Sequence, residues 1–165
     1  MEGSTITIVE ADLSRPEHAR DVVAMTQTYA RDPMGNGAPL DDAIAARLIA
    51  GLRSHPTTLI WLAYDGDRVV GIATCFGGFS TFQARPLINI HDLAVAPAQR
   101  GRGVGMRLLA AVEAKARALD CCRLTLEVQE NNDKARRVYA RAGFAQMIYG
   151  ESAGGSLFYV KPLDR

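Results

Sequence analysis

The chain has 165 residues, which is long enough for one domain to bury a continuous hydrophobic core. Of these residues 48% are hydrophobic and 22% are charged, and the formal net charge is +1, as in an ordinary globular protein. The arginines are spread among 18 acidic residues, which excludes a basic surface for nucleic acid. The start of the chain lacks the pattern of a signal peptide, and no apolar run is long enough to span a membrane, so we expect a cytoplasmic protein with no membrane partner.

The cysteines have no spacing that indicates a metal site or a disulfide framework. Cys75, Cys121 and Cys122 are odd in number, lack CxxC spacing and have no histidine cluster beside them. We therefore expect three buried or half-buried thiols and no metal.

The first half of the chain contains both strand and helix patterns. Alternating polar and apolar residues predict a strand at 5–10, and apolar stripes at helical spacing predict helices at 16–30 and 42–54. Apolar runs on both sides of the turn "DGD" predict a hairpin of strands 58–64 and 68–76. The stretch "GGFSTFQARP" that follows is expected to be a loop.

The second half continues the same mixture. A strand is predicted at 87–95, a helix at 106–119, a strand at 123–128, a helix at 131–142, and a final hairpin from "FAQMIYG" and "SLFYVKP". The predicted order is βααβββαβαββ, an α/β fold with a mixed sheet. The sequence contains no linker and no repeat, so we expect a single domain over residues 1–165.

A glycine-rich segment, "QRGRGVG", lies between a predicted strand and a predicted helix. Gly101, Gly103 and Gly105 would allow positive φ angles and a close approach of a ligand to the backbone, while the helix start offers free N–H groups to an anion. Neither GxxxxGK[ST] nor GxGxxG fits, since Met106 occupies the last position of the second motif. A turn needed only for packing is the alternative.

The segment reads as RxxGxG, and here the sequence resembles the GNAT superfamily of acetyl-CoA-dependent N-acetyltransferases. The resemblance also covers "LTLEV" and the stretch "NNDKARRVYARAGF", which is similar to the motif NxxAxxxYxxxGF of that family. It implies a GNAT-like α/β fold: a mixed, mostly antiparallel sheet flanked by helices, with a parallel pair of strands splayed around the cofactor. The residues that carry the second motif are Asn132, Ala135, Tyr139, Gly143 and Phe144.

The resemblance also implies where acetyl-CoA binds. The pantetheine arm would bond to the backbone of Leu93 and Val95 like an added strand, and the N–H of Val95 would donate to the developing oxyanion. Asn132 would bond the cofactor or cap its helix. The pyrophosphate would lie on the segment formed by Arg100, Gly101, Arg102, Gly103, Val104 and Gly105, with either arginine also neutralising phosphate.

By the same resemblance, Tyr139 is the acid that protonates the leaving thiolate. With ordinary pKa values of about 10 and 8.5 that transfer is uphill by roughly 2 kcal/mol. Glu127 is the first candidate for the general base, because several relatives carry a glutamate at this position beside the cofactor groove. His91, Asp92 or a water molecule are the other candidates.

The acceptor is expected to be a primary amine of a small molecule or a peptide. Its pocket would be lined by Tyr29, Asp32, Phe79 and Phe82, with His91 and Asp92 at its edge. The stretch around this pair faintly resembles diamine acetyltransferases, but they carry a Glu-Asp pair where this chain has His-Asp. The sequence does not determine which amine is the acceptor, which acyl-chain length is preferred, or whether the protein forms a homodimer. A non-catalytic domain that binds acyl-CoA as a sensor is the alternative function, and a nucleotide-dependent enzyme is a third.

Overall fold

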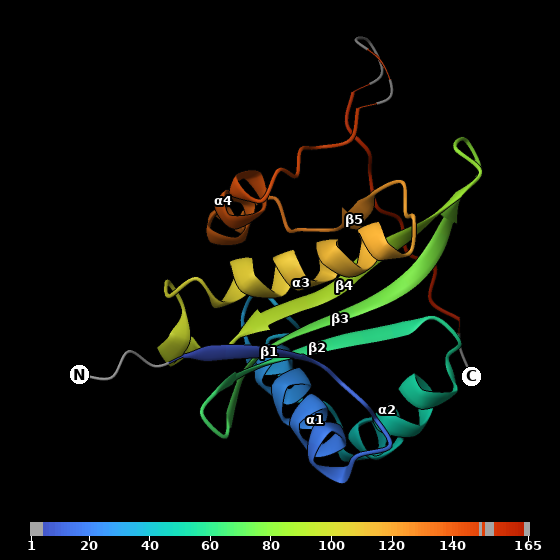
Figure 1. The fold of residues 1–165 in the computed structure, drawn as a ribbon. Helices are drawn as coiled ribbons and strands as arrows, with labels where there is room; N and C mark the ends of the chain where they lie inside the picture. The colour runs from blue at the N-terminus through green and yellow to red at the C-terminus, as the bar shows by residue number, and fades with distance from the viewer. Residues whose placement is uncertain (1–4, 149, 151–153, 164–165) are drawn as a thin grey trace.

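The computed structural model describes residues 5–148, 150 and 154–163, and across them five strands form one sheet in the order β1-β2-β3-β4-β5 (Figure 1). Neighbouring strands are antiparallel except β4 and β5, which are parallel. The elements in chain order are β1 (Ile6–Glu10), α1 (Pro16–Arg31), α2 (Asp42–Ser54), β2 (Thr58–Asp65), β3 (Arg68–Ser80), β4 (Arg85–Val95), the short 3-10 helix η1 (Pro97–Gln99), α3 (Val104–Ala118), β5 (Leu124–Leu126) and α4 (Asp133–Arg141).

The helix starts follow from local chemistry. Pro16 occupies the first turn of α1, where its missing N–H has no cost. Asp41 caps α2 by accepting a hydrogen bond from the N–H of Ala43 at 2.8 Å. Both helices therefore begin where the sequence predicts.

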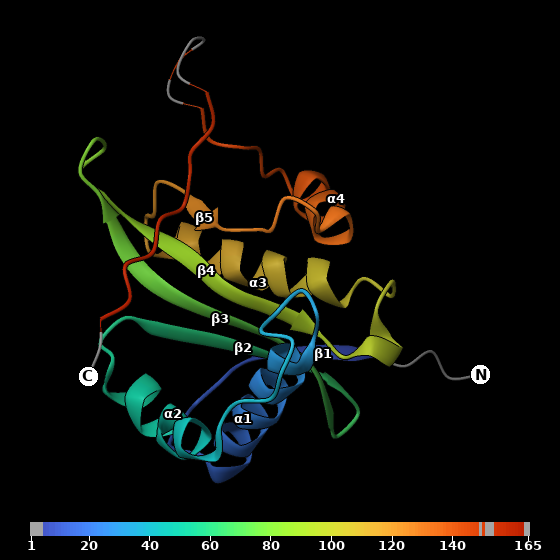
Figure 2. The same ribbon diagram turned by 180° about the vertical axis from the view of Figure 1, so that it is seen from behind.

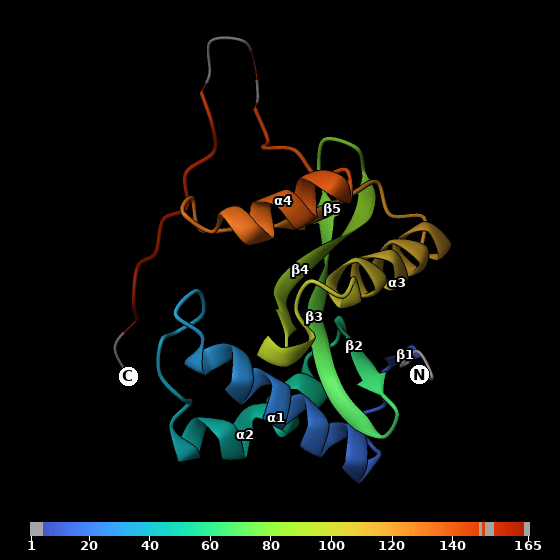
Figure 3. The ribbon, with the colours of Figure 1, turned by 90° about the vertical axis from the view of Figure 1, so that its left-hand side faces the viewer.

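The sheet carries a hydrophobic core on each face. Helix α3 packs on one face, and α1 and α2 pack on the other, so the sheet lies between two helical layers (Figures 2 and 3). The α3 side is built around Trp61, Ile88, Leu108 and Val112, all buried. In the described part of the chain, no helix combines the length and the apolarity that spanning a membrane requires.

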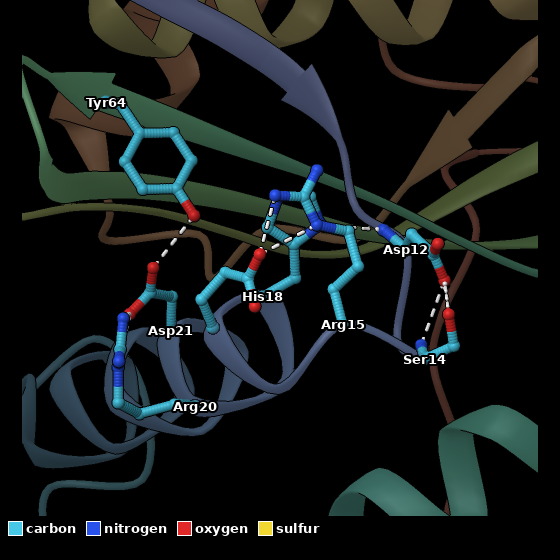
Figure 4. Close-up of polar contacts among 8 residues, drawn as sticks. Asp12, Ser14, Arg15, His18, Arg20, Asp21 and Tyr64 are labelled. Atoms are coloured by element: carbon cyan, nitrogen blue, oxygen red, sulfur yellow. Dashed lines mark hydrogen bonds and ion pairs between the residues drawn. The ribbon is translucent and has the colours of Figure 1, made fainter.

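Polar contacts fix the start of α1 against the sheet (Figure 4). The hydroxyl of Tyr64 on β2 donates to Oδ2 of Asp21 at 2.8 Å, and burial and this bond raise the pKa of Tyr64 to about 12. The N–H of Asp12 donates to Nδ1 of the buried His18 at 2.9 Å. These bonds satisfy polar groups that would otherwise be costly at the helix–sheet boundary.

Two predicted segments differ from the structure. The predicted loop at 77–86 is wrong: β3 continues to Ser80 and pairs with β4 from Arg85 onward, so only a tight turn at 81–84 remains. The final hairpin is represented in the described residues by one isolated bridge between Ile148 and Gly155. Part of that hairpin, residues 149 and 151–153, lies outside the described residues.

The close approach of α3 to β3 depends on Gly71. A Cβ there would meet side-chain atoms of Leu108 and Val104 at 3.1 Å and of Ala63 at 3.2 Å. We expect Gly71→Ala to lower the free energy of unfolding by about 1–3 kcal/mol through overpacking, as measured by chemical denaturation.

The matched control is Gly51→Ala in α2, where a Cβ meets nothing within 4 Å. There the same change should stabilise the protein by about 0.5–1 kcal/mol through helix propensity. Equal effects at the two positions would contradict the proposed packing of α3.

Candidate active site

A β-bulge in β4 reverses which backbone groups face the edge of the strand. Thr74 pairs with Asp92 and the next residue of β3 pairs with Ile90, so His91 is an extra residue. Before the bulge, the N–H of Ile88 donates towards β5; after it, the N–H of Ala96 donates to β3 at 2.8 Å. Two even-numbered residues would face the same side in a regular strand. The bulge has therefore turned the odd-numbered backbone groups beyond it away from β3.

Leu93 and Val95 carry these outward-facing groups. β5 pairs with β4 only from Ile88 to Ile90, so within the described residues the edge of β4 from 91 to 95 has no strand beside it. In Figure 1, β4 runs on towards η1 while the chain leaving β5 turns towards α4. The two parallel strands thus diverge. We call the region between residues 91–95 of β4 and the chain after β5 the opening, and backbone donors and acceptors of β4 lie on its inner edge.

The glycine-rich turn follows directly at the end of this edge. Gly101 and Gly103 have φ values of 78° and 81°, in the region that favours glycine. Gly105 corrects the expectation for the third glycine, because it lies inside α3 without a positive φ. A Cβ at Gly105 would lie 3.9 Å from Val95 and 4.0 Å from Val138, which is ordinary van der Waals contact, so this position lies where α3 meets β4 and α4 and has room for a methyl group.

The turn presents free amides at the positive end of α3. In the part of the chain that the structure describes, the N–H groups of residues 101–106 donate to no protein acceptor. A Cβ at Gly101 or Gly103 would meet nothing within 4 Å, which means that open space lies before these amides. Free N–H groups at a helix start form a site for an anion such as a pyrophosphate.

Gln99 holds the turn in place. Its side chain is buried, and its Nε2 donates to Oδ2 of Asp65 at the end of β2 at 2.8 Å. Its Oε1 accepts a hydrogen bond from Arg102 at 2.5 Å. Sequence reasoning missed Gln99, because a lone glutamine before a glycine-rich turn carries no recognisable signal.

Arg100 joins the turn to the loop between α1 and α2. Its Nε donates to the carbonyl of Val95 at 3.0 Å, and its Nη2 pairs with Asp32 at 2.5 Å. The hydrogen bond from the N–H of Met34 is the largest cause that lowers the pKa of Asp32, and the contact with Arg100 lowers it further. Asp32 and Arg100 are thus brought together, and the N–H of Val95 still faces the opening.

Three titratable side chains meet at the opening. Burial is the main cause that raises the pKa of Tyr139, to about 12, and the neighbouring Tyr29 raises it further. The pKa of Tyr29 is raised by burial and then by the charges of Asp92 and Asp32. Tyr29 comes from α1 and Tyr139 from α4, so the two hydroxyl-bearing side chains approach from opposite sides of the sheet.

Asp92 is the carboxylate of this group. Burial raises its pKa, although the charge of His91 opposes the shift. Ile90 and Leu93 both pack on the α3 side, so the bulge leaves His91 and Asp92 together on the α1 side. His91 is exposed and its ring makes an edge contact with Phe76 at a centroid distance of 5.5 Å.

Other predicted residues lie at different depths. Glu127 follows the end of β5 and is exposed. Asn132 takes the capping role: its Oδ1 accepts a hydrogen bond from the N–H of Ala135 at 3.2 Å at the start of α4.

Phe79 and Phe82 are not brought to the opening. They are 62% and 87% exposed, at the hairpin end of β3. Val95 pairs with Gly71, which lies about 26 Å from Phe79 along the strand at 3.3 Å per residue. The prediction that they line the pocket depends on a loop at 77–86, and the continuous strand carries them away from the site.

The cysteines match the expectation, with Cys75 buried and Cys121 and Cys122 half-buried, all free. Among the described residues no group of histidine, cysteine, aspartate and glutamate side chains has the arrangement of a metal site. A cavity of about 420 Å³ lies between α3, residues 121–124 and residues 142–145, and no predicted site residue lines it. The chemistry of the opening is therefore that of backbone donors, a carboxylate and two phenols.

Comparison with known proteins gives consistent results. The model of the Acetyltransferase (GNAT) family matches residues 22–144. A streptothricin acetyltransferase of Streptomyces lavendulae is 30% identical over 148 residues, covering 88% of this chain and 73% of that protein. The uncharacterized N-acetyltransferase YhfO of Bacillus subtilis is 30% identical over 101 residues, covering 61% of this chain and 67% of that protein. The crystal structure of a probable acetyltransferase has the same fold, with a TM-score of 0.79, 21% identity, and coverage of 96% and 99%.

Proposed function

Since the chain belongs to the acetyltransferase (GNAT) family and is an N-acetyltransferase, we propose that it moves an acetyl group from acetyl-CoA directly to a primary amine, without a covalent enzyme intermediate. The observation that carries this proposal is the continuity of the outward-facing backbone of Leu93 and Val95 with the free amides of residues 101–106. An extended ligand with amide groups at one end and a pyrophosphate at the other matches that arrangement.

The residues present fit acetyl-CoA, which supplies the activated acetyl thioester when bound. The amides of the glycine-rich turn hold the pyrophosphate, and the edge of β4 holds the pantetheine arm. The N–H of Val95 is the donor for the oxygen that becomes negative during transfer. Because the carbonyl of Val95 is already bonded to Arg100, that end of the strand is fixed before the ligand binds.

Asp92 is the stronger candidate for the general base. A carboxylate whose pKa is raised by burial accepts a proton from an ammonium more readily than an exposed one of ordinary pKa. Glu127 is exposed, and the prediction that it is the general base depends on the family resemblance alone. Asp92 also lies beside Tyr29, whose hydroxyl can relay a proton or orient the amine.

Tyr139 is proposed as the acid for the leaving thiolate. Its pKa of about 12 keeps the phenol protonated over the whole working range of pH. Against a thiol of pKa about 8.5, the proton transfer is uphill by about 5 kcal/mol, more than the ordinary tyrosine pKa suggests. That remains well below the overall barrier of about 16 kcal/mol for a turnover of about 10 per second.

The alternative is a domain of the same fold that only binds acyl-CoA. The group formed by Tyr29, Asp92 and Tyr139 favours the enzyme, because binding alone needs no half-buried carboxylate with a raised pKa at the opening. A panel of primary amines with detection of released thiol separates the two. Tight CoA binding with no thiol release from any amine would favour the sensor.

The role of the turn can be tested at Gly103. We expect Gly103→Ala to weaken CoA binding about tenfold or more, because a methyl group then occupies the open space before the amides. Isothermal titration with CoA measures the effect.

The control is Gly66→Ala, in the β2–β3 turn. Its φ of 61° is also positive and a Cβ there also meets nothing within 4 Å, so it carries a similar backbone strain. It should leave CoA affinity unchanged. Equal loss of affinity in both variants would mean that strain alone, and not the turn, is responsible.

The acid can be tested by Tyr139→Phe. We expect turnover to fall about 100-fold or more while the Kd for CoA stays within a factor of about two, because only the proton donor is removed. Tyr64→Phe is the control, since Tyr64 has the same raised pKa of about 12 but donates to Asp21 away from the opening. Unaltered turnover in Tyr139→Phe would remove the phenol from the mechanism.

Asp92→Asn should separate stability from activity. The folded-state pKa of Asp92 is raised, so the folded protein binds a proton more tightly than the unfolded chain and loses stability as pH rises through that pKa. At pH 7 we therefore expect Asp92→Asn to melt higher than the wild type, with the difference shrinking as pH falls towards 4. Calorimetric melting temperatures across this range measure it.

In the same variant kcat/KM should fall and lose its rise with pH, since the base is gone. Glu127→Gln changes an exposed carboxylate and should alter neither readout. A large loss of kcat/KM in Glu127→Gln, with Asp92→Asn fully active, would transfer the role of base to Glu127.

A further inference from the structure

Arg123, at the start of β5, is a half-buried cation without an anionic partner. Its Nε is buried and has no hydrogen-bond partner, and its Nη2 donates only to the neutral hydroxyl of Ser80, at 3.4 Å. The ion pairs of the described residues do not include Arg123. A guanidinium withdrawn from water in this way is stabilised by an acceptor that completes its hydrogen bonds.

The side chain lies on the same face of the sheet as the candidate base. Leu124 and Leu126 pack into the core on the α3 side, so alternation along the strand places Arg123, Thr125 and Glu127 on the opposite side. Asn89 of β4 confirms this direction, since its Nδ2 donates to Oγ1 of Thr125 at 3.0 Å. Although residues 121–124 also border the cavity beside α3, the guanidinium of Arg123 reaches across to β3.

The separation between the arginine and the opening sets a length. Glu127 lies beside the opening and Arg123 lies four residues earlier, about 13 Å along the strand at 3.3 Å per residue. The guanidinium bonds Ser80, which pairs with Arg85 and so lies further still from the opening, and this gives a separation of about 17 Å. Between them the face is neutral, formed by Thr125 and Asn89. An acceptor whose amine is at the opening would meet a single positive charge at its other end.

We propose that Arg123 binds a carboxylate of the acceptor, so that the preferred substrates are amines with an anionic group about 17 Å away, as in a peptide of about five residues. This inference rests on the proposed acetyl transfer and names its substrate class. A single guanidinium matches a single carboxylate in charge and in its forked geometry. The neutral hydroxyl of Ser80 serves as the resting partner that the carboxylate replaces.

The test compares pentaglycine with pentaglycine amide. An extended chain of five residues spans about 17 Å, and the two compounds differ only in the charge of the far end. In the wild type we expect kcat/KM for the acid to exceed that for the amide by about tenfold or more. In Arg123→Gln the ratio of kcat/KM for the acid to kcat/KM for the amide should fall close to one, because kcat/KM for the acid decreases.

Two further variants make the result specific. Arg117→Gln removes an exposed arginine of α3 that pairs with Glu113, and it should keep the wild-type ratio. Arg123→Lys keeps a positive charge and should keep part of the preference, which shows that any loss in Arg123→Gln is not a folding defect. Equal use of acid and amide by the wild type, or an unchanged ratio in Arg123→Gln, would overturn the proposal.

A binding readout separates this proposal from the proposed function. If neither compound releases thiol from acetyl-CoA, titration of the protein with each compound, followed by chemical-shift changes, still compares acid with amide. Tighter binding of the acid that is lost in Arg123→Gln would support the anion site even though acetyl transfer had failed. Equal binding in both proteins would reject it.

Discussion

The bulge at His91 is the constraint on which the site depends. A regular β4 would direct the backbone of Asp92 and Ala94 towards β5 and leave Leu93 and Val95 bonded to β3. One extra residue reverses this and also places two successive side chains on the α1 side. The same local irregularity therefore creates the edge proposed to bind the ligand and places the half-buried carboxylate of Asp92 at the opening.

The features gathered around the bulge each lower the stability of the fold. A carboxylate with a burial-raised pKa, amides without acceptors and two residues of positive φ lie within one short stretch, from Asp92 to Met106. Elsewhere the polar groups near α1 are paired, as Tyr64 is with Asp21. Several local rules broken together at one place are expected at a functional site.

The sequence predicts the parts of this site that are encoded locally. The glycine-rich turn, the cap at Asn132 and the helix starts are read from residues adjacent in the chain. The bulge is not, because it depends on how β4 pairs with β3, and the pattern "NIHDLAV" is compatible with a regular strand. The misplaced Phe79 and Phe82 have the same origin, since two glycines in "FGGFS" resemble a loop although they pair within the hairpin. The sequence does not predict a role for Arg123, because the structure is needed to show that its Nε is buried without a partner.

The width of the opening is set by packing more than by polar contacts. The loop after α1 does bridge both sides, through Asp32 to Arg100 and through the carbonyl of Met34, which accepts from Gln129 at 3.2 Å. These contacts lie near the surface, with Arg100 about half exposed, and exposed ion pairs contribute only about 0–1 kcal/mol.

Gly105 lies where α3 meets two other elements, since a Cβ there would be in ordinary van der Waals contact with both Val95 of β4 and Val138 of α4. Tyr139 follows Val138 on α4 and packs against Phe144 with a ring-centroid distance of 6.0 Å. The apolar packing of α4 beside the glycine-rich turn therefore sets the position of the Tyr139 phenol relative to the edge of β4. The third glycine of the motif thus lies at the point where α3, β4 and α4 meet, whereas the first two contribute through their backbone conformation.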